Sequence, residues 1–352
     1  QLHFPCRYPA FQFLIKSPLT AGWSNGRIMS VFSIHKLLQF QPMRIIALAG
    51  LGLLYSPAGA IAAPDSSPVY ADVIGEIGQY VTTGDDTLLD VARRFSLGFT
   101  ELVAANPGID PWLPGKGVRI TLPSAHILPR GPREGVMLNL ADQRMYIFRP
   151  KTGTVISVPV GVGRDAWNTP IGSTKIVRKK ANPAWHPPKS IRLADPTLPR
   201  VVPAGPQNPL GQHAVYLGLS GYLFHGTNKP MGVGRRVSHG CVRLYPEDIK
   251  RLFKKFAIGT RVTIIDEPMK IAWLDDQLLL EIHPSQSQAD DMEAGDRITP
   301  EKPMDFEYRI IAAAGAQAHR LNWVDIKNTL QQRAGIPVNI LNPIRTAAAP
   351  DS

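Results

Sequence analysis

The sequence predicts a mainly β domain with one main helix over residues 134–268, preceded by a small β-α-α-β domain over residues 78–124. Two observations lead to this prediction. Short apolar stretches alternate with polar residues and turn signals throughout the larger region, as in half-buried strands. The smaller region instead has helical spacing of its apolar residues between two strand-like runs.

The small domain is expected to begin with a strand at residues 80–82 and to end with a strand at residues 118–123. Its first helix has apolar residues at i, i+3, i+4 and i+7, with Asp85 or Asp86 as the cap; these residues are Leu88, Val91, Ala92 and Phe95. A second, shorter helix is expected to be capped by Thr100 and to end before Asn106. Residues 125–132 are then expected to form a linker.

In the larger domain a hairpin is expected from the runs 136–140 and 143–148. The other expected strands cover residues 154–162, 214–217, 222–224 and 260–265. The main helix is placed at Pro246–Phe256, because proline suits its first position and the acidic residues that follow complement its N-terminal end. The proline-rich segment 182–211 is expected to lack regular structure and to act as a functional loop.

Residues 1–62 are interpreted as an upstream extension followed by a signal peptide. Met43 and Arg44 precede ten apolar residues, and small residues then fit cleavage near Ala62. Ten residues are too few to span a bilayer, although a retained anchor is the alternative. Cleavage would remove five of the 39 Lys and Arg residues and none of the 28 Asp and Glu residues, so the net charge would fall from +11 to +6. This mild excess suits a polyanionic wall and lacks the clustered basic stripe of a nucleic-acid binder.

The C-terminal tail, residues 284–352, has no function that the sequence indicates. Residues 286–301 are polar and are expected to be a spacer, whereas residues 320–333 have helical spacing.

The chain holds two cysteines, Cys6 and Cys241, and Cys6 precedes the expected cleavage site. An exported chain left with one thiol keeps it either for its reactivity or as a small buried hydrophobe, because no disulfide partner remains. The glycine at position 240 and the polar residues around Cys241 favour a reactive thiol.

A thiol becomes a strong nucleophile when a nearby base removes its proton. His225 follows the strand-like run 222–224, so we assign it as the base and give His239 a structural or oxyanion-side role. Gly240 lacks a side chain, which lets the N–H groups of Gly240 and Cys241 face a developing oxyanion. Arg243 is a fixed cation suited to a substrate carboxylate, and an ion pair with Glu247 or Asp248 is the alternative.

The runs His225-Gly226-Thr227-Asn228 and Ser238-His239-Gly240-Cys241-Val242-Arg243-Leu244 resemble the signature of the YkuD-type L,D-transpeptidases, most closely the ErfK/YbiS group of Gram-negative bacteria. The likeness covers residues 135–267. Residues 80–123 resemble a LysM module, a class that binds N-acetylglucosamine-containing glycans such as peptidoglycan. The gap between the two runs is short for the family, and Arg243 stands where the broader family often has asparagine.

The resemblance implies a YkuD-like β-sandwich and a peptidoglycan L,D-transpeptidase without metal or cofactor. Cys241 would attack the carbonyl at the L-centre of diaminopimelate in a tetrapeptide stem, release D-alanine and leave a thioester. The amine of a second diaminopimelate or of an outer-membrane lipoprotein lysine would resolve it, in the periplasm. His225 would transfer the proton, the Gly226 carbonyl would orient its ring, and Arg243 and Ser238 would bind substrate.

Three alternatives remain at this stage. In papain-like peptidases the cysteine precedes its histidine, which is the opposite of the order here. Zinc binding by His225, His239 and Cys241 lacks the paired-cysteine spacing of structural zinc sites. The third alternative is a wall-binding LysM protein whose cysteine domain is inactive or hydrolytic.

Overall fold

The computed structural model describes residues 70–295, 299 and 301–343. The predicted signal peptide and Cys6 lie outside these residues. Within them, no helix combines the length and apolar character needed to cross a membrane.

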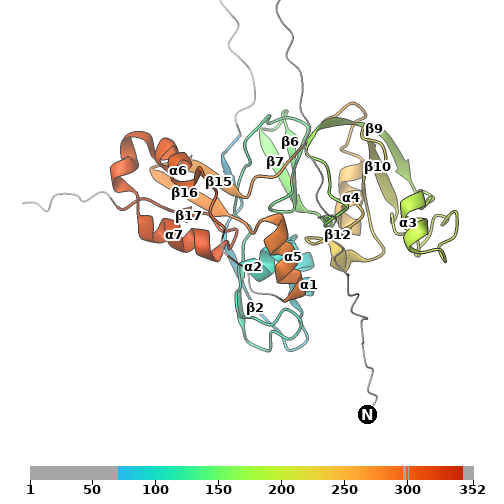
Figure 1. Ribbon diagram of the computed structural model, residues 1–352, viewed down its shortest axis with the longest axis horizontal. Coiled ribbons are helices and arrows are strands. Elements are labelled where there is room, and N and C mark those ends of the chain that lie inside the picture. The colour runs from blue at the N-terminus through green and yellow to red at the C-terminus, as the bar shows by residue number, and fades with distance from the viewer. Residues whose placement is uncertain (1–69, 296–298, 300, 344–352) are drawn as a thin grey trace, which may run out of the picture. The chain divides into compact units, whose positions relative to one another are not determined.

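The N-terminal unit has its elements in the order strand, helix, helix, strand (Figure 1). Its strands β2 (Gly78–Val81) and β3 (Arg119–Leu122) pair antiparallel, and the helices between them are α1 (Leu88–Arg94) and α2 (Phe99–Ala104). Their apolar sides form a separate small core. Strand β1 (Val73–Ile74), which precedes this unit in the sequence, pairs antiparallel with β4 (His126–Ile127), which follows it.

Both predicted helix caps in this unit were wrong. Thr87 caps α1 by accepting from the N–H of Asp90, whose side chain returns the interaction in a capping box. Asp86 instead accepts hydrogen bonds from Tyr80 and Thr83. Gly98 is the N-cap of α2, and Thr100 lies inside that helix.

The larger domain is built on one eight-stranded mixed sheet in the order β13-β11-β10-β9-β14-β5-β6-β7. The strands are β5 (Val136–Asn139), β6 (Arg144–Arg149), β7 (Thr154–Pro159), β9 (Gly172–Ala181), β10 (His213–Leu217), β11 (Leu223–His225), β13 (Val242–Arg243) and β14 (Arg261–Ile265). The β11–β13 and β14–β5 pairs are parallel. A separate two-stranded parallel pair joins β8 (Val162–Gly163) to β12 (Arg236–Ser238).

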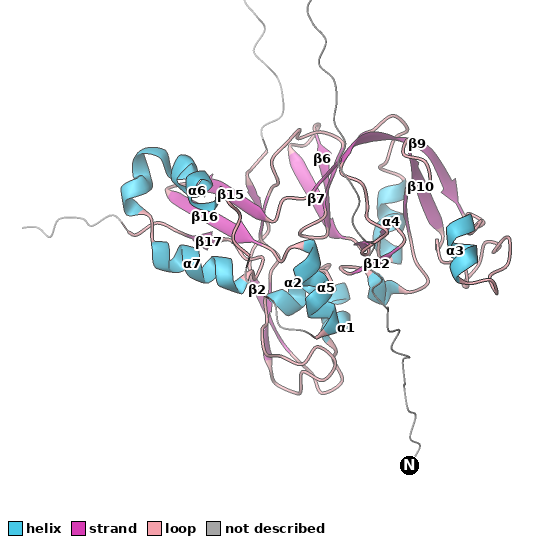
Figure 2. Ribbon diagram, in the orientation of Figure 1, coloured by secondary structure: helices cyan, strands magenta, loops and turns pink. Residues whose placement is uncertain are grey.

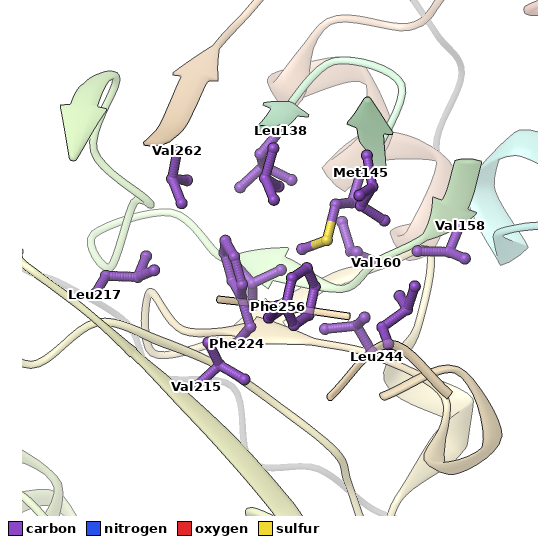
Figure 3. Packing of buried hydrophobic residues seen from close by; sticks show 14 of the residues in the cluster. Leu138, Met145, Val158, Val160, Val215, Leu217, Phe224, Leu244, Phe256 and Val262 are labelled. Carbon is purple, nitrogen blue, oxygen red and sulfur yellow. The ribbon is translucent and has the colours of Figure 1, made fainter. Parts of the chain in front are cut away.

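The predicted mainly β architecture is confirmed, but the strands belong to one continuous sheet rather than to the two sheets of a sandwich. Side chains from both halves of this sheet enter a single core, which means that the sheet curls around it. Leu138 and Met145 come from one half, and Val215 and Phe224 come from the other (Figure 3). The pairing of β14 with β5 and β9 joins the two halves.

Helix α4 (Pro246–Phe253) starts at the predicted residue and ends three residues earlier than predicted. It packs Ile249 and Leu252 into the core. The proline-rich segment is mostly loop, as expected, but it contains the short helix α3 (Lys189–Ala194), which we had not predicted (Figure 2). A 3₁₀ turn, η1 (Pro230–Gly232), lies between β11 and β12.

The C-terminal residues form a compact unit rather than a tail (Figure 2). Its sheet contains β15 (Met269–Leu274), β16 (Gln277–Ile282) and β17 (Val338–Asn339). Its helices are α6 (Phe306–Ala314) and α7 (Trp323–Gln332), with the 3₁₀ helix η2 (Gly315–Arg320) after α6. Helix α5 (Gln286–Ala294), which comes between β16 and α6 in the sequence, lies apart from this unit and contacts α2 and β12 (Figure 1). The expected spacer therefore begins as helix α5, capped by Ser285 and ended by Gly295 at φ +77°.

Candidate active site

A cavity of about 370 Å³ brings together the side chains of Cys241, His225, His239, Ser238 and Arg243. The parallel pairing of β11 with β13 sets His225 opposite Arg243 and Phe224 opposite Val242. Cys241 immediately precedes β13, so the same register places it beside Leu223, and the alternation of side chains puts the thiol on the same face as His225 and Arg243. The Cys241 thiol donates to the carbonyl oxygen of Gly221 at 3.4 Å.

His225 is buried, and its Nδ1 lies 2.5 Å from the carbonyl oxygen of Gly226. A carbonyl oxygen only accepts, so Nδ1 carries the proton and Nε2 keeps the lone pair of a base. Burial and the charge of Arg243 lower the pKa of His225 to about 4. The imidazole is therefore neutral at neutral pH and able to accept a proton.

Burial raises the pKa of the Cys241 thiol, and the nearby Arg243 charge opposes this only partly. In the substrate-free chain the Cys241 thiol therefore rests protonated and the His225 imidazole rests neutral. The proton would have to leave the thiol as the nucleophile attacks, which is general-base catalysis.

His239 is half-buried at the edge of the cavity. Its Nε2 lies 3.3 Å from the Nη2 of Arg164, and its ring packs edge-on against Trp167 with centroids 4.9 Å apart. Partial burial and the charge of Arg164 lower the pKa of His239. Of the two candidate bases, His225 is the buried one whose tautomer is set by a backbone carbonyl.

Ser238 and Gly240 form hydrogen bonds within the loop that carries Cys241. The Ser238 hydroxyl donates to the Cys241 carbonyl at 2.5 Å and accepts from the N–H of Gly240 at 3.1 Å, so it shapes the loop. The Gly240 N–H is therefore engaged, which leaves the Cys241 N–H as the candidate for an oxyanion. Gly240 has φ +95°, and a Cβ there would lie 2.8 Å from the Tyr222 ring, so a side chain would strain the turn.

Arg243 is largely buried, and burial lowers its pKa. The alternative ion pairs were wrong, since Glu247 pairs with Arg93 and Asp248 pairs with Arg251. Among residues 70–295, 299 and 301–343, no carboxylate forms an ion pair with Arg243. It is a desolvated cation facing the thiol cavity.

Sequence reasoning missed two contributors to the site. Arg178 lines the cavity, with its guanidinium carbon 3.7 Å from the centre of the Tyr216 ring, because the β9–β10 register sets these residues opposite each other. Thr169 donates from its hydroxyl to the carbonyl of Gly240 at 2.9 Å. Both depend on contacts between distant segments, which no local pattern reveals. Trp185 and His186, from the proline-rich segment, also line the cavity.

Within the part of the chain that the structure describes, no group of three His, Cys, Asp or Glu side chains is arranged to hold a metal ion. His225, His239 and Cys241 share a cavity, yet they do not form such a group.

The family described as YkuD, the L,D-transpeptidase catalytic domain, matches residues 133–264. The probable L,D-transpeptidase YbiS of Escherichia coli is 39% identical over 71% of this chain and 81% of its own length. The probable L,D-transpeptidase YcfS of Escherichia coli is 36% identical over 78% of this chain and 86% of its own. The probable L,D-transpeptidase ErfK/SrfK of Salmonella typhimurium is 37% identical over 75% of this chain and 87% of its own length.

A solved L,D-transpeptidase from Mycobacterium smegmatis aligns with 20% identity and a TM-score of 0.31, over 43% of this chain and 64% of that chain. A score that low carries no argument about the site. The sequence relatives cover more than two thirds of their own length at well over 30% identity, and they share the domain that contains the thiol cavity. The chain therefore belongs to the L,D-transpeptidase family.

Proposed function

We propose that this chain is a peptidoglycan L,D-transpeptidase in which Cys241 is the acylated nucleophile. One observation carries the proposal: a thiol, a neutral imidazole held by a backbone carbonyl and an arginine without an ion-pair partner in the described chain share one cavity. These groups supply a nucleophile, a base and a carboxylate-binding cation. Acyl transfer from a carboxylate-bearing peptide needs all three.

In the proposed reaction Nε2 of His225 accepts the thiol proton while Sγ bonds to the carbonyl carbon at the L-centre of diaminopimelate. The Cys241 N–H stabilises the oxyanion. The carbon–nitrogen bond to D-alanine then breaks, and the imidazolium returns the proton to the leaving amine. An acceptor amine attacks the resulting thioester, restores the thiol and forms the new amide bond.

The acceptor is proposed to be either a second diaminopimelate, which gives a 3→3 cross-link, or the C-terminal lysine of an outer-membrane lipoprotein. We further propose that the N-terminal unit is a LysM-like module that binds the glycan, because its strand-helix-helix-strand order and its loop sequences fit such modules. Export to the periplasm by the segment before residue 63 is part of the same proposal. The competing function is a wall-binding protein with an inactive or hydrolytic cysteine domain.

The test is to incubate the processed chain with tetrapeptide muropeptides, with and without a lipoprotein peptide ending in lysine. We expect loss of D-alanine, a thioester mass on the peptide containing Cys241, and an amide product with one of the two amines. Cys241→Ala should abolish all three while retaining the wild-type melting temperature. Transfer by that variant would contradict the assignment, and release of free tripeptide alone would favour the hydrolytic alternative.

A further inference from the structure

The segment between His225 and Cys241 is held by two helices that come from outside the larger domain, α2 and α5. On one side, the N–H of Thr100 in α2 donates to the carbonyl of Gly234 at 3.0 Å. A Cβ on Gly234 would lie 2.2 Å from the Cα of Gly98, so the two backbones touch. On the other side, the segment meets helix α5. Residues 234–236, which precede the Cys241 loop, therefore contact both α2 and α5.

Helix α5 contacts this segment almost entirely through two arginines. The side chain of Arg236 is only 4% exposed, and its Nε lies 2.8 Å from Oδ1 of Asp290. Its other nitrogens donate to Gln286 and, at 3.4 Å, to Oδ1 of Asn168. Glu293 accepts from the backbone N–H of Arg236 at 3.1 Å and pairs with the guanidinium of Arg235 at 2.9 Å. A buried guanidinium needs such partners, because an unpaired one would cost several kcal/mol.

Arg236 is connected to the nucleophile by short paths. It begins β12, and this strand ends at Ser238, whose hydroxyl binds the carbonyl of Cys241. Its second path runs through Asn168 to the adjacent Thr169, whose hydroxyl binds the carbonyl of Gly240. The carbonyls of Gly240 and Cys241 are thus held by hydroxyl groups from two segments, β12 and the loop containing Asn168. Arg236 connects both segments to α5 through its contacts with Asp290 and Asn168.

We propose that helix α5 positions the Cys241 loop through Arg236, and that Asp290 and Glu293 are positioning residues for acyl transfer. The part of this inference that concerns acyl transfer rests on the proposed function, but the placement of the thiol does not. Removing the Asp290 carboxylate frees one end of Arg236 and loosens β12. Loosening moves the thiol relative to the base, and small misplacements of reacting groups slow catalysis strongly. Helix α5 thereby acts on the reaction without touching the substrate.

The experiment compares Asp290→Ala and Asp290→Asn with a matched control, Glu134→Ala. Glu134 forms an exposed ion pair of similar length, 2.7 Å, with Arg261, and neither residue lines the thiol cavity. For each variant we would measure kcat and KM for transfer, the rate of Cys241 alkylation by iodoacetamide and the melting temperature. Alkylation is read by mass on the peptide containing Cys241.

Asp290→Ala should lower kcat about tenfold with KM within about twofold, and should change the alkylation rate by about threefold or more. Asp290→Asn should recover most of both rates, because its amide oxygen still accepts from Nε of Arg236. Glu134→Ala should leave both rates unchanged.

A folded Asp290→Ala protein with wild-type kcat and alkylation rate would overturn the proposal. So would a lower melting temperature with normal rates per folded molecule. Should Asp290→Ala not fold, the same readouts on Gln286→Ala decide, because this change removes another acceptor that α5 offers to Arg236, and unchanged rates would reject the positioning role. If wild-type protein shows no transfer but its alkylation rate still differs from that of the variants, the proposed function fails and the positioning role stands.

Discussion

Two arginines beside the nucleophile differ in what their guanidinium groups bind. Arg236 is paired with Asp290, whereas Arg243 has no ion-pair partner within the described residues. Both are mostly buried, so each has lost most of its hydration. A buried cation without a partner gains most from an incoming carboxylate, and we therefore propose that Arg243 is the one of the two that binds substrate.

Replacing Arg243 should therefore impair transfer more than stability. Arg243→Ala should raise the barrier by about 1.5–3 kcal/mol, the contribution of a charged hydrogen bond, and Arg243→Lys should lie between it and the wild type because it keeps the charge but loses the forked donors. Steady-state kinetics and melting temperatures test this together. A large drop in melting temperature with normal activity per folded molecule would mean that Arg243 is structural.

The pH dependence of transfer should have its acidic limb near the pKa of His225. Below about pH 4 the imidazole holds a proton and accepts none, so kcat/KM should fall as the pH falls through about 4. The pKa of His225 is lower in the folded protein, about 4, than in the unfolded chain, about 6.5. The stability that His225 contributes is therefore complete above about pH 6.5 and is lost as the pH falls through about 4. Rates and melting curves measured over this range check both statements. An acidic limb near pH 6.5 in a fully folded protein would contradict the first.

At the scale of elements, local patterns predicted most strands and the main helix of the larger domain. Helix α5 was missed because it is polar, with no wide apolar stripe. Its cap and its ion pairs with Arg235 and Arg236 hold it instead, and those partners lie fifty or more residues away. The continuous sheet was missed for a similar reason, because the parallel pairing of β14 with β5 joins segments that no short-range pattern relates.

The candidate site also has features that the sequence predicted and features that it did not. Cys241, His225 and Arg243 were singled out from residue chemistry and spacing, and they line one cavity. The hydrogen bonds of Ser238 and Gly240 were not predicted, because they depend on how a tight turn bonds with itself. Loop conformation decides such details, and the sequence alone leaves it open.

The N-terminal unit is better tested by substitution than by deletion. Glu101 of α2 pairs with the buried Arg144 of β6, so deletion of the N-terminal unit would leave a buried cation without its partner in the larger domain. Trp112 is 51% exposed on the unit and packs against Phe99. An exposed indole is a suitable surface for the apolar face of a sugar ring.

We expect Trp112→Ala to weaken binding to purified sacculi roughly tenfold, the effect of about 1.4 kcal/mol, while transfer on small soluble muropeptides stays unchanged. A pull-down titration on sacculi measures the first, and the muropeptide assay measures the second. Val324→Ala removes an exposed apolar side chain from the C-terminal unit and serves as the control. Equal binding by all three proteins would reject glycan binding at Trp112.

Across the whole molecule, buried charges join the three units. Lys270 of β15 lies 3.0 Å from the carboxylate of Asp142 and 2.6 Å from that of Glu281, and all three side chains are almost fully buried. The second carboxylate oxygen of Glu281 accepts from the backbone N–H of Ile127 in β4 at 2.5 Å. Together with the Glu101–Arg144 pair, these contacts link the N-terminal unit, the eight-stranded sheet and the C-terminal unit. The relative placement of the units therefore depends on charges that water does not screen.

Lys270→Met should destabilise the protein by about 3–5 kcal/mol, because two buried carboxylates lose their shared cation while the side-chain volume is nearly kept. Lys270 holds the pKa of Asp142 below its usual value in the wild type, so that carboxylate contributes stability that is lost only as the pH falls through its lowered pKa. Without the cation, burial raises the pKa of Asp142, and this carboxylate takes up a proton at higher pH.

The difference in unfolding free energy between variant and wild type should therefore shrink as the pH falls from about 7 to about 5. Urea titrations at several pH values measure it, with the exposed pair variant Glu134→Ala expected to cost at most about 1 kcal/mol at any of them. A loss of unfolding free energy for Lys270→Met that does not change with pH would indicate that the variant is destabilised by altered packing alone. It would contradict the proposal that buried charges connect the three units.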